Sequence, residues 1–115
     1  MAAVRSGTLA AWAVLAMAGW CGPAWADGAE PPEVVGKRLF TRDAAPACAV
    51  CHTLKDAGAE GTVGPVLDEL KPSADRVAAA LRSGLGVMPS YRASLSESQI
   101  QALARYVSVA SGGSK

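Results

Sequence analysis

The stretch Cys48-Ala49-Val50-Cys51-His52 constrains this chain more than any other part of its sequence. It places two thiols one short turn apart and follows the second thiol directly with an imidazole. Three groups able to bind a cofactor therefore come from one short segment of backbone. Whatever fold the chain adopts must leave room for a ligand beside residues 48–52.

Three ordinary explanations of this motif each lack a necessary part. A structural disulfide accounts for the cysteines but not for the adjacent histidine, and a thioredoxin-like dithiol needs a βαβ setting that the sequence does not show. A zinc site normally needs four Cys and His ligands, and only these three lie beyond residue 26. The spacing C-x-x-C-H is typical of covalent haem attachment. We therefore predict one covalent haem c, with Cys48 and Cys51 bound to its vinyl groups and His52 bound to the iron.

The first quarter of the chain has the pattern of a secretory signal peptide. A single positive charge precedes an uncharged apolar run, and Ala24-Trp25-Ala26 has the small-x-small pattern that signal peptidase recognises. We expect residues 1–26 to be removed and residues 27–115 to form one periplasmic domain. Two alternatives stay open. Residues 6–26 could remain as a membrane anchor, or Cys21 could be acylated, although the large residue before it disfavours lipoprotein processing.

The composition of residues 27–115 excludes several classes of function. Loss of Arg5 takes the eleven basic residues to ten, equal to the ten acidic ones, so the net charge is close to zero. No basic patch suited to nucleic acid is present, and no second apolar stretch is long enough to span a bilayer. Only three aromatic side chains remain, which is few for a small core, so a large apolar cofactor is expected to fill its centre.

Helical periodicity without any period-two alternation predicts an all-α fold. Ser73 can cap one helix that Gly84 ends, and Ser96 with Gln99 has the pattern of a capping box at the start of the last helix. The final glycines and serines are expected to form a flexible tail. The predicted elements are a helix at 33–40, a loop at 53–64, a short helical turn at 65–70, and helices at 73–83 and 96–110.

Met88 is the candidate for the second iron ligand. It is the only methionine beyond the leader, and thioethers are established haem ligands. It lies in a loop, residues 84–91, whose glycines allow close approach and whose Pro89 stiffens the chain beside the sulfur. The alternative is a lone methionine that fills a gap in the core. The order of motif, helix, Met-Pro loop and final helix favours ligation.

On these residues, the chain from about 34 to 109 resembles the class I c-type cytochromes. A glycine in the middle of a helix weakens it, so such a residue indicates close contact with another element. The resemblance implies a small class I cytochrome c fold, with the first and last helices crossing and the haem in the core. The residues that match the family's crossing are Gly36 and Phe40 in the first helix and Leu103 and Tyr106 in the last.

The resemblance also implies roles for residues outside the motif. Gly64-Pro65 would pass the proximal side of the haem, and the Pro65 carbonyl would accept a hydrogen bond from the second ring nitrogen of His52. A turn proline without that role is the alternative. Tyr91 and Arg92 follow Met88 closely enough to reach a haem propionate, and a packed ring with a solvated charge is the equal alternative.

Two protein ligands leave no iron position for a substrate, so we expect one-electron transfer and not catalysis. Residues 58–70 resemble small cytochromes that accept electrons from molybdenum-dependent sulfite dehydrogenases, which makes such an enzyme the expected donor. A terminal oxidase or another cytochrome is the expected acceptor. The alternative function is an open-site haem protein for peroxide turnover or gas sensing. The balanced charge predicts docking with modest salt dependence, unless Lys37, Arg38 and Arg42 form a basic patch instead of a solvated helix face.

Overall fold

A computed structural model describes residues 28–114 of the chain, together with Ala3. The expected signal peptide, the alternative membrane anchor and the alternative acylation at Cys21 lie outside the described residues. Within the described part of the chain, no helix has both the length and the apolar character needed to cross a membrane.

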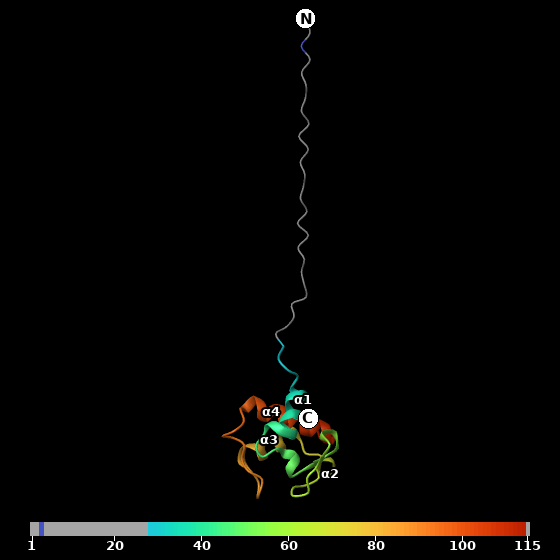
Figure 1. The fold of residues 1–115 in the computed structure, drawn as a ribbon, viewed down its shortest axis with the longest axis vertical. Coiled ribbons are helices and arrows are strands. Elements are labelled where there is room, and N and C mark those ends of the chain that lie inside the picture. The colour runs from blue at the N-terminus through green and yellow to red at the C-terminus, as the bar shows by residue number, and fades with distance from the viewer. Residues whose placement is uncertain (1–2, 4–27, 115) are drawn as a thin grey trace.

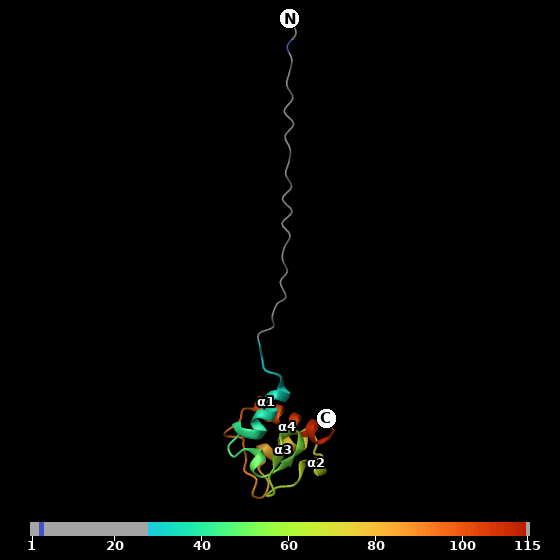
Figure 2. The same cartoon turned by 45° about the vertical axis from the view of Figure 1, so that its right-hand side comes forward.

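Four α-helices form the body of residues 28–114, and the last of them is central (Figure 1). Helices α1 and α3 both pack against α4. Figure 2 shows the pairing of α1 with α4 from a second angle. The helices are α1 (Pro32–Arg38), α2 (Leu67–Leu70), α3 (Ala74–Ser83) and α4 (Glu97–Ser111).

The two longer helices begin at the predicted caps. The Ser73 hydroxyl accepts a hydrogen bond from the backbone N–H of Arg76 at 3.3 Å, and α3 ends at Gly84, which has φ of 71°. At the start of α4, the Ser96 hydroxyl accepts from the Gln99 N–H at 3.2 Å, and the Gln99 side chain accepts from the Ser96 N–H at 2.9 Å. The predicted capping box is therefore present.

The first helix differs from its predicted course at its end. After α1 the chain continues as one π-helical turn, η1 (Leu39–Asp43), in which Phe40 is buried. The Thr41 hydroxyl donates to the Lys37 carbonyl at 2.9 Å, and so competes with the backbone for that acceptor. Ordinary 3.6-residue periodicity does not predict such a wider turn.

The all-α prediction is wrong in one segment. Residues 53–64, predicted as loop, contain an antiparallel pair of strands, β1 (Thr53–Leu54) and β2 (Ala59–Glu60), with Leu54 opposite Ala59. The turn between them includes a short 3₁₀ segment, η3 (Lys55–Ala57). Each strand is two residues long, which is too short for alternation of apolar and polar residues to appear in the sequence.

The C-terminal residues are also more ordered than expected. Gly112 has φ of 79°, and the N–H of Gly113 donates to the Ser108 carbonyl at 2.7 Å. The Ser108 hydroxyl in turn donates to the Ser114 carbonyl at 2.7 Å. This is the glycine cap that commonly closes a helix, so the two glycines end α4 instead of starting a flexible tail.

The predicted helix crossing is present at Gly36. A Cβ at this position would lie 2.4 Å from Cβ of Tyr106 and 2.6 Å from the carbonyl oxygen of Ala102, so only glycine allows α1 this close to α4. The rings of Phe40 and Tyr106 pack edge to face beside it, with centroids 6.1 Å apart. Leu103, which follows Ala102 on α4, is fully buried. The crossing fixes one wall of the site described next.

Candidate functional site

A cavity of about 320 Å³ brings the predicted site residues together from three separate segments. The remaining walls come mainly from apolar side chains of α2, α3 and α4, which form part of the hydrophobic core. All six predicted residues line the cavity: Cys48, Cys51, His52, Pro65, Met88 and Tyr91.

The cysteines reach the cavity because their backbone turns tightly. Residues Cys48–Val50 form a 3₁₀ turn, η2, and the N–H groups of Cys51 and His52 both donate to the Cys48 carbonyl, at 3.1 and 2.9 Å. Val50 is 65% exposed and faces away from the core. The two thiols are free, and burial raises the pKa of Cys48 to about 11. A thiol that stays protonated at neutral pH is poorly suited to dithiol redox chemistry.

The His52 ring is held in one orientation. Its Nδ1 lies 2.9 Å from the Pro65 carbonyl oxygen. Because a carbonyl can only accept, Nδ1 is the donor in this bond, and in the neutral ring Nε2 therefore keeps the lone pair that can bind a metal. Gly64 makes this arrangement possible, since a Cβ there would lie 2.5 Å from Cε1 of the ring. The hydrogen bond that the family resemblance implied is therefore present in the structure.

Met88 is positioned by a tight turn after α3. Leu85 and Met88 exchange two backbone hydrogen bonds of 3.0 Å, and Gly86 between them has φ of 58°. Val87 at the tip is 88% exposed, whereas Met88 is half-buried against the core and lines the cavity. The turn thus presents a thioether to the same cavity as the imidazole.

Tyr91 is packed into the cavity wall. It is 4% exposed, and its hydroxyl donates to the Pro46 carbonyl at 2.7 Å. Burial raises the pKa of its hydroxyl to about 12. The hydrogen of this hydroxyl is used within the protein, which favours the packed ring over a propionate contact. Arg92 is exposed and is not among the cavity residues, which favours the solvated charge.

Arg76 is a site residue that the sequence reasoning missed. It is the only charged side chain among the described residues that line the cavity. It precedes Val77 in the first turn of α3, and Ala80 and Leu81 lie one turn further along the same wall. The sequence did offer one indication. Arg76 and Ala80 are four residues apart and therefore share a helix face, which in the structure lines the cavity.

The mouth of the cavity is apolar and exposed. Val63 is 68% exposed, Leu85 71% and Val87 88%, and all three line the cavity. Large exposed aliphatic side chains gathered at one opening are typical of a surface that another protein covers. These three aliphatic side chains therefore give the lining of the cavity an exposed apolar part.

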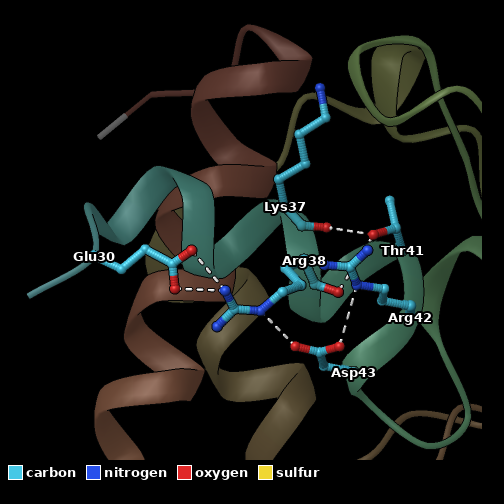
Figure 3. A network of polar contacts seen from close by, with 6 residues as sticks. All are labelled: Glu30, Lys37, Arg38, Thr41, Arg42 and Asp43. Atoms are coloured by element: carbon cyan, nitrogen blue, oxygen red, sulfur yellow. Dashed lines mark hydrogen bonds and ion pairs between the residues drawn. The ribbon is translucent and has the colours of Figure 1, made fainter.

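The three cations of the first helical segment do not form a free basic patch. Figure 3 shows the contacts of Arg38 and Arg42 with their carboxylates. Arg38 binds Glu30 through Nη1 at 2.6 Å and Asp43 through Nε at 2.6 Å. Each of the others also faces a carboxylate: Lys37 Nζ lies 3.3 Å from Asp56 Oδ2, and Arg42 Nε lies 3.5 Å from Asp43 Oδ1. This favours the interpretation as a solvated, internally paired helix face.

The residues around the cavity fit a haem. The two thiols are adjacent to the imidazole, a thioether comes from another segment, and Gly64 has no side chain to displace the His52 ring. The apolar walls suit a macrocycle, and the single cation Arg76 suits its carboxylates. For the zinc alternative, no group of three or more His, Cys, Asp or Glu residues in 28–114 is arranged to hold a metal ion.

Comparisons with known proteins agree with this chemistry. Residues 32–107 match the family described as cytochrome c oxidase, cbb3-type, subunit III. The crystal structure of the c-type cytochrome SorU from Sinorhizobium meliloti matches with a TM-score of 0.68 and 46% sequence identity, over 71% of this chain and 93% of that chain. A comparison with curated proteins finds no match. With its C-x-x-C-H segment lining a cavity of the matched fold, the chain belongs to the cytochrome c family.

Proposed function

We propose that the protein is a periplasmic one-electron carrier with a single haem, attached through Cys48 and Cys51 and ligated by His52 and Met88. Membership of the cytochrome c family implies a covalent haem c and a role in electron transfer rather than catalysis. One observation carries the proposal: two thiols, an imidazole with a free Nε2 and a thioether line one cavity.

The protein's contribution follows from how these side chains are held. The Pro65 carbonyl fixes the His52 ring and increases its basicity toward a metal. His52 and Met88 would both hold the iron, which would leave no open position for a substrate. The walls of the site are mainly apolar, which would disfavour water beside the bound group. When bound, the haem supplies an Fe(III)/Fe(II) couple, and a ligand set that stays the same in both states suits rapid transfer.

The exposed mouth is where we expect partners to approach. Val63, Leu85 and Val87 surround the opening, so a partner that covers them would bring its own redox centre close to the cavity. Association through aliphatic contacts depends little on salt, whereas association steered by charge depends on it strongly. The cations near α1 are paired with carboxylates, which is consistent with association through aliphatic contacts.

For the partners, we propose a sulfite dehydrogenase as donor and a terminal oxidase or another cytochrome as acceptor. The resemblance of residues 58–70 to cytochromes that serve such enzymes supports this donor, as does the 46% identity to SorU. In the structure these residues include β2, the Gly64-Pro65 contact with His52 and α2. Stopped-flow reduction of the ferric protein by a purified sulfite dehydrogenase, compared with an unrelated dehydrogenase, tests the assignment. Equal rates with both enzymes would contradict it.

The absorption spectrum tests the axial ligands. The ferric protein should be low-spin and show the weak far-red band that the family associates with methionine ligation. M88A should lose this band and become high-spin, because the Met88 thioether would no longer hold the iron. V109A is the control, since Val109 is 51% exposed and is not among the residues that line the cavity. A high-spin wild-type spectrum would refute the carrier proposal and favour the open-site alternative.

Localisation is tested by the mature N-terminus. If residues 1–26 are a cleaved leader, mass spectrometry of the periplasmic fraction should find a haem-bearing chain that begins at Asp27. A chain that retains residues 6–26 and sediments with membranes would support the anchor instead.

A further inference from the structure

The loop that carries Met88 is attached chiefly to the helix before it. Within residues 84–91, the Tyr91 N–H donates to the Leu81 carbonyl at 2.7 Å, and the Ser90 hydroxyl donates to the Arg82 carbonyl at 2.6 Å. These bonds join the loop to the end of α3. They fix no distance between Met88 and the cysteine segment, although an iron bound by both His52 and Met88 requires a fixed distance.

One hydrogen bond does connect the two sides. Among the hydrogen bonds of the described residues, only that from the Tyr91 hydroxyl to the Pro46 carbonyl joins residues 84–91 to the segment before the cysteines. It is 2.7 Å long and spans 45 residues of sequence. Pro46 lies two residues before Cys48, and Tyr91 lies three after Met88. Both residues line the cavity.

We propose that this hydrogen bond is a clasp across the cavity, and that Tyr91 is a positioning residue for the Met88–iron bond. The inference rests on the proposed ligation by Met88. Cys48 anchors the haem next to one end of the clasp, and Met88 approaches the iron next to the other end. The clasp therefore resists the movement by which the Met88 loop would leave the iron.

The contribution of the Tyr91 hydroxyl can be tested separately from that of its ring. Tyr91 is 4% exposed, so phenylalanine would keep the packing and remove only the donor. Pro46 is exposed, so water can satisfy its carbonyl once the donor is gone. Loss of the hydrogen bond should therefore make the Met88 loop open more easily. It should have little effect on the free energy of unfolding.

Imidazole is the probe. It binds the ferric iron only when Met88 leaves, so its dissociation constant, followed by the absorption spectrum, reports how easily the loop opens. Y91F should tighten imidazole binding by about 2- to 10-fold, the effect expected from one neutral hydrogen bond. Y106F is the matched control. Tyr106 is 5% exposed and its hydroxyl donates to Asp56 at 2.7 Å, but it does not line the cavity. Y106F should leave imidazole binding unchanged.

The M88A background distinguishes the possible failures. There, Y91F should have no effect, because no ligand remains to be displaced. If Y91F behaves like Y106F, or tightens imidazole binding equally with and without Met88, the clasp is refuted while Met88 ligation stands. If M88A itself leaves the imidazole affinity at the wild-type value, Met88 is not a ligand, and both the proposed function and the clasp fail.

Discussion

Replacing Gly36 by alanine sets two effects of opposite sign against each other at the crossing of α1 and α4. Alanine favours a helix over glycine by about 1 kcal/mol, which would stabilise the protein. The added Cβ, however, would lie 2.4 Å from Cβ of Tyr106 and 2.6 Å from the Ala102 carbonyl oxygen. Carbon atoms pack at about 3.5 to 4.0 Å, so the helices would have to separate by roughly 1 Å. Neither opposing atom is the end of a flexible side chain.

Overpacking of this kind typically costs about 1 to 3 kcal/mol, and separation would also weaken the Phe40–Tyr106 pair, worth about 0.5 to 1.5 kcal/mol. The clash should win, so G36A should lower the free energy of unfolding by about 1 to 3 kcal/mol after the gain in helix propensity is subtracted. Urea unfolding of the ferric holoprotein, followed by circular dichroism, measures it. G28A is the control, since a Cβ on Gly28 meets nothing within 4 Å. An unchanged or increased free energy of unfolding in G36A would refute the reasoning.

Three further predictions concern the pH dependence, the proximal wall and docking. The Arg82 guanidinium lowers the pKa of Glu97 from 4.5 to about 2, so the stability from this pair is present above pH 4.5 and is lost as the pH falls through about 2. Urea unfolding over this range should show a smaller loss in R82Q. G64A should displace the His52 ring, because a Cβ would lie 2.5 Å from Cε1, and should reduce the yield of haem-loaded protein measured spectrophotometrically. The rate of electron transfer to a partner should fall by less than about tenfold between low and moderate salt, and a steeper loss would indicate charge-steered docking.

The parts of the fold that sequence could predict are those determined by near neighbours. Ser73 and Ser96 each cap a helix through a residue three positions away, so the caps of α3 and α4 are visible in the sequence. The strand pair and the C-terminal cap are local too, but their signals are ambiguous. Two-residue strands show no periodicity, and Gly112-Gly113 reads equally as a flexible tail or as a helix cap.

The features of the site also differ in how far apart in the sequence the residues that determine them lie. The cysteine motif needs only adjacent residues, so sequence was sufficient to identify it. The bond from His52 to Pro65, thirteen residues apart, was expected only through the family resemblance. The contact of Tyr91 with Pro46 spans 45 residues and has no counterpart in local pattern. Arg76 was overlooked because a cation on a helix is ordinarily solvated, so its spacing from Ala80 indicated little until the fold showed that this helix face lines the cavity.

Helix α4 couples the crossing to the site, because its residues serve two purposes. Ala102 and Tyr106 contact α1 at Gly36, whereas Leu103 and Val107 line the cavity. Displacement of α4 by a larger residue at position 36 would therefore shift the cavity wall as well as weaken the fold. Although Gly36 itself does not line the cavity, G36A should also tighten imidazole binding to the ferric iron, because a shifted wall would loosen the proposed Met88–iron bond.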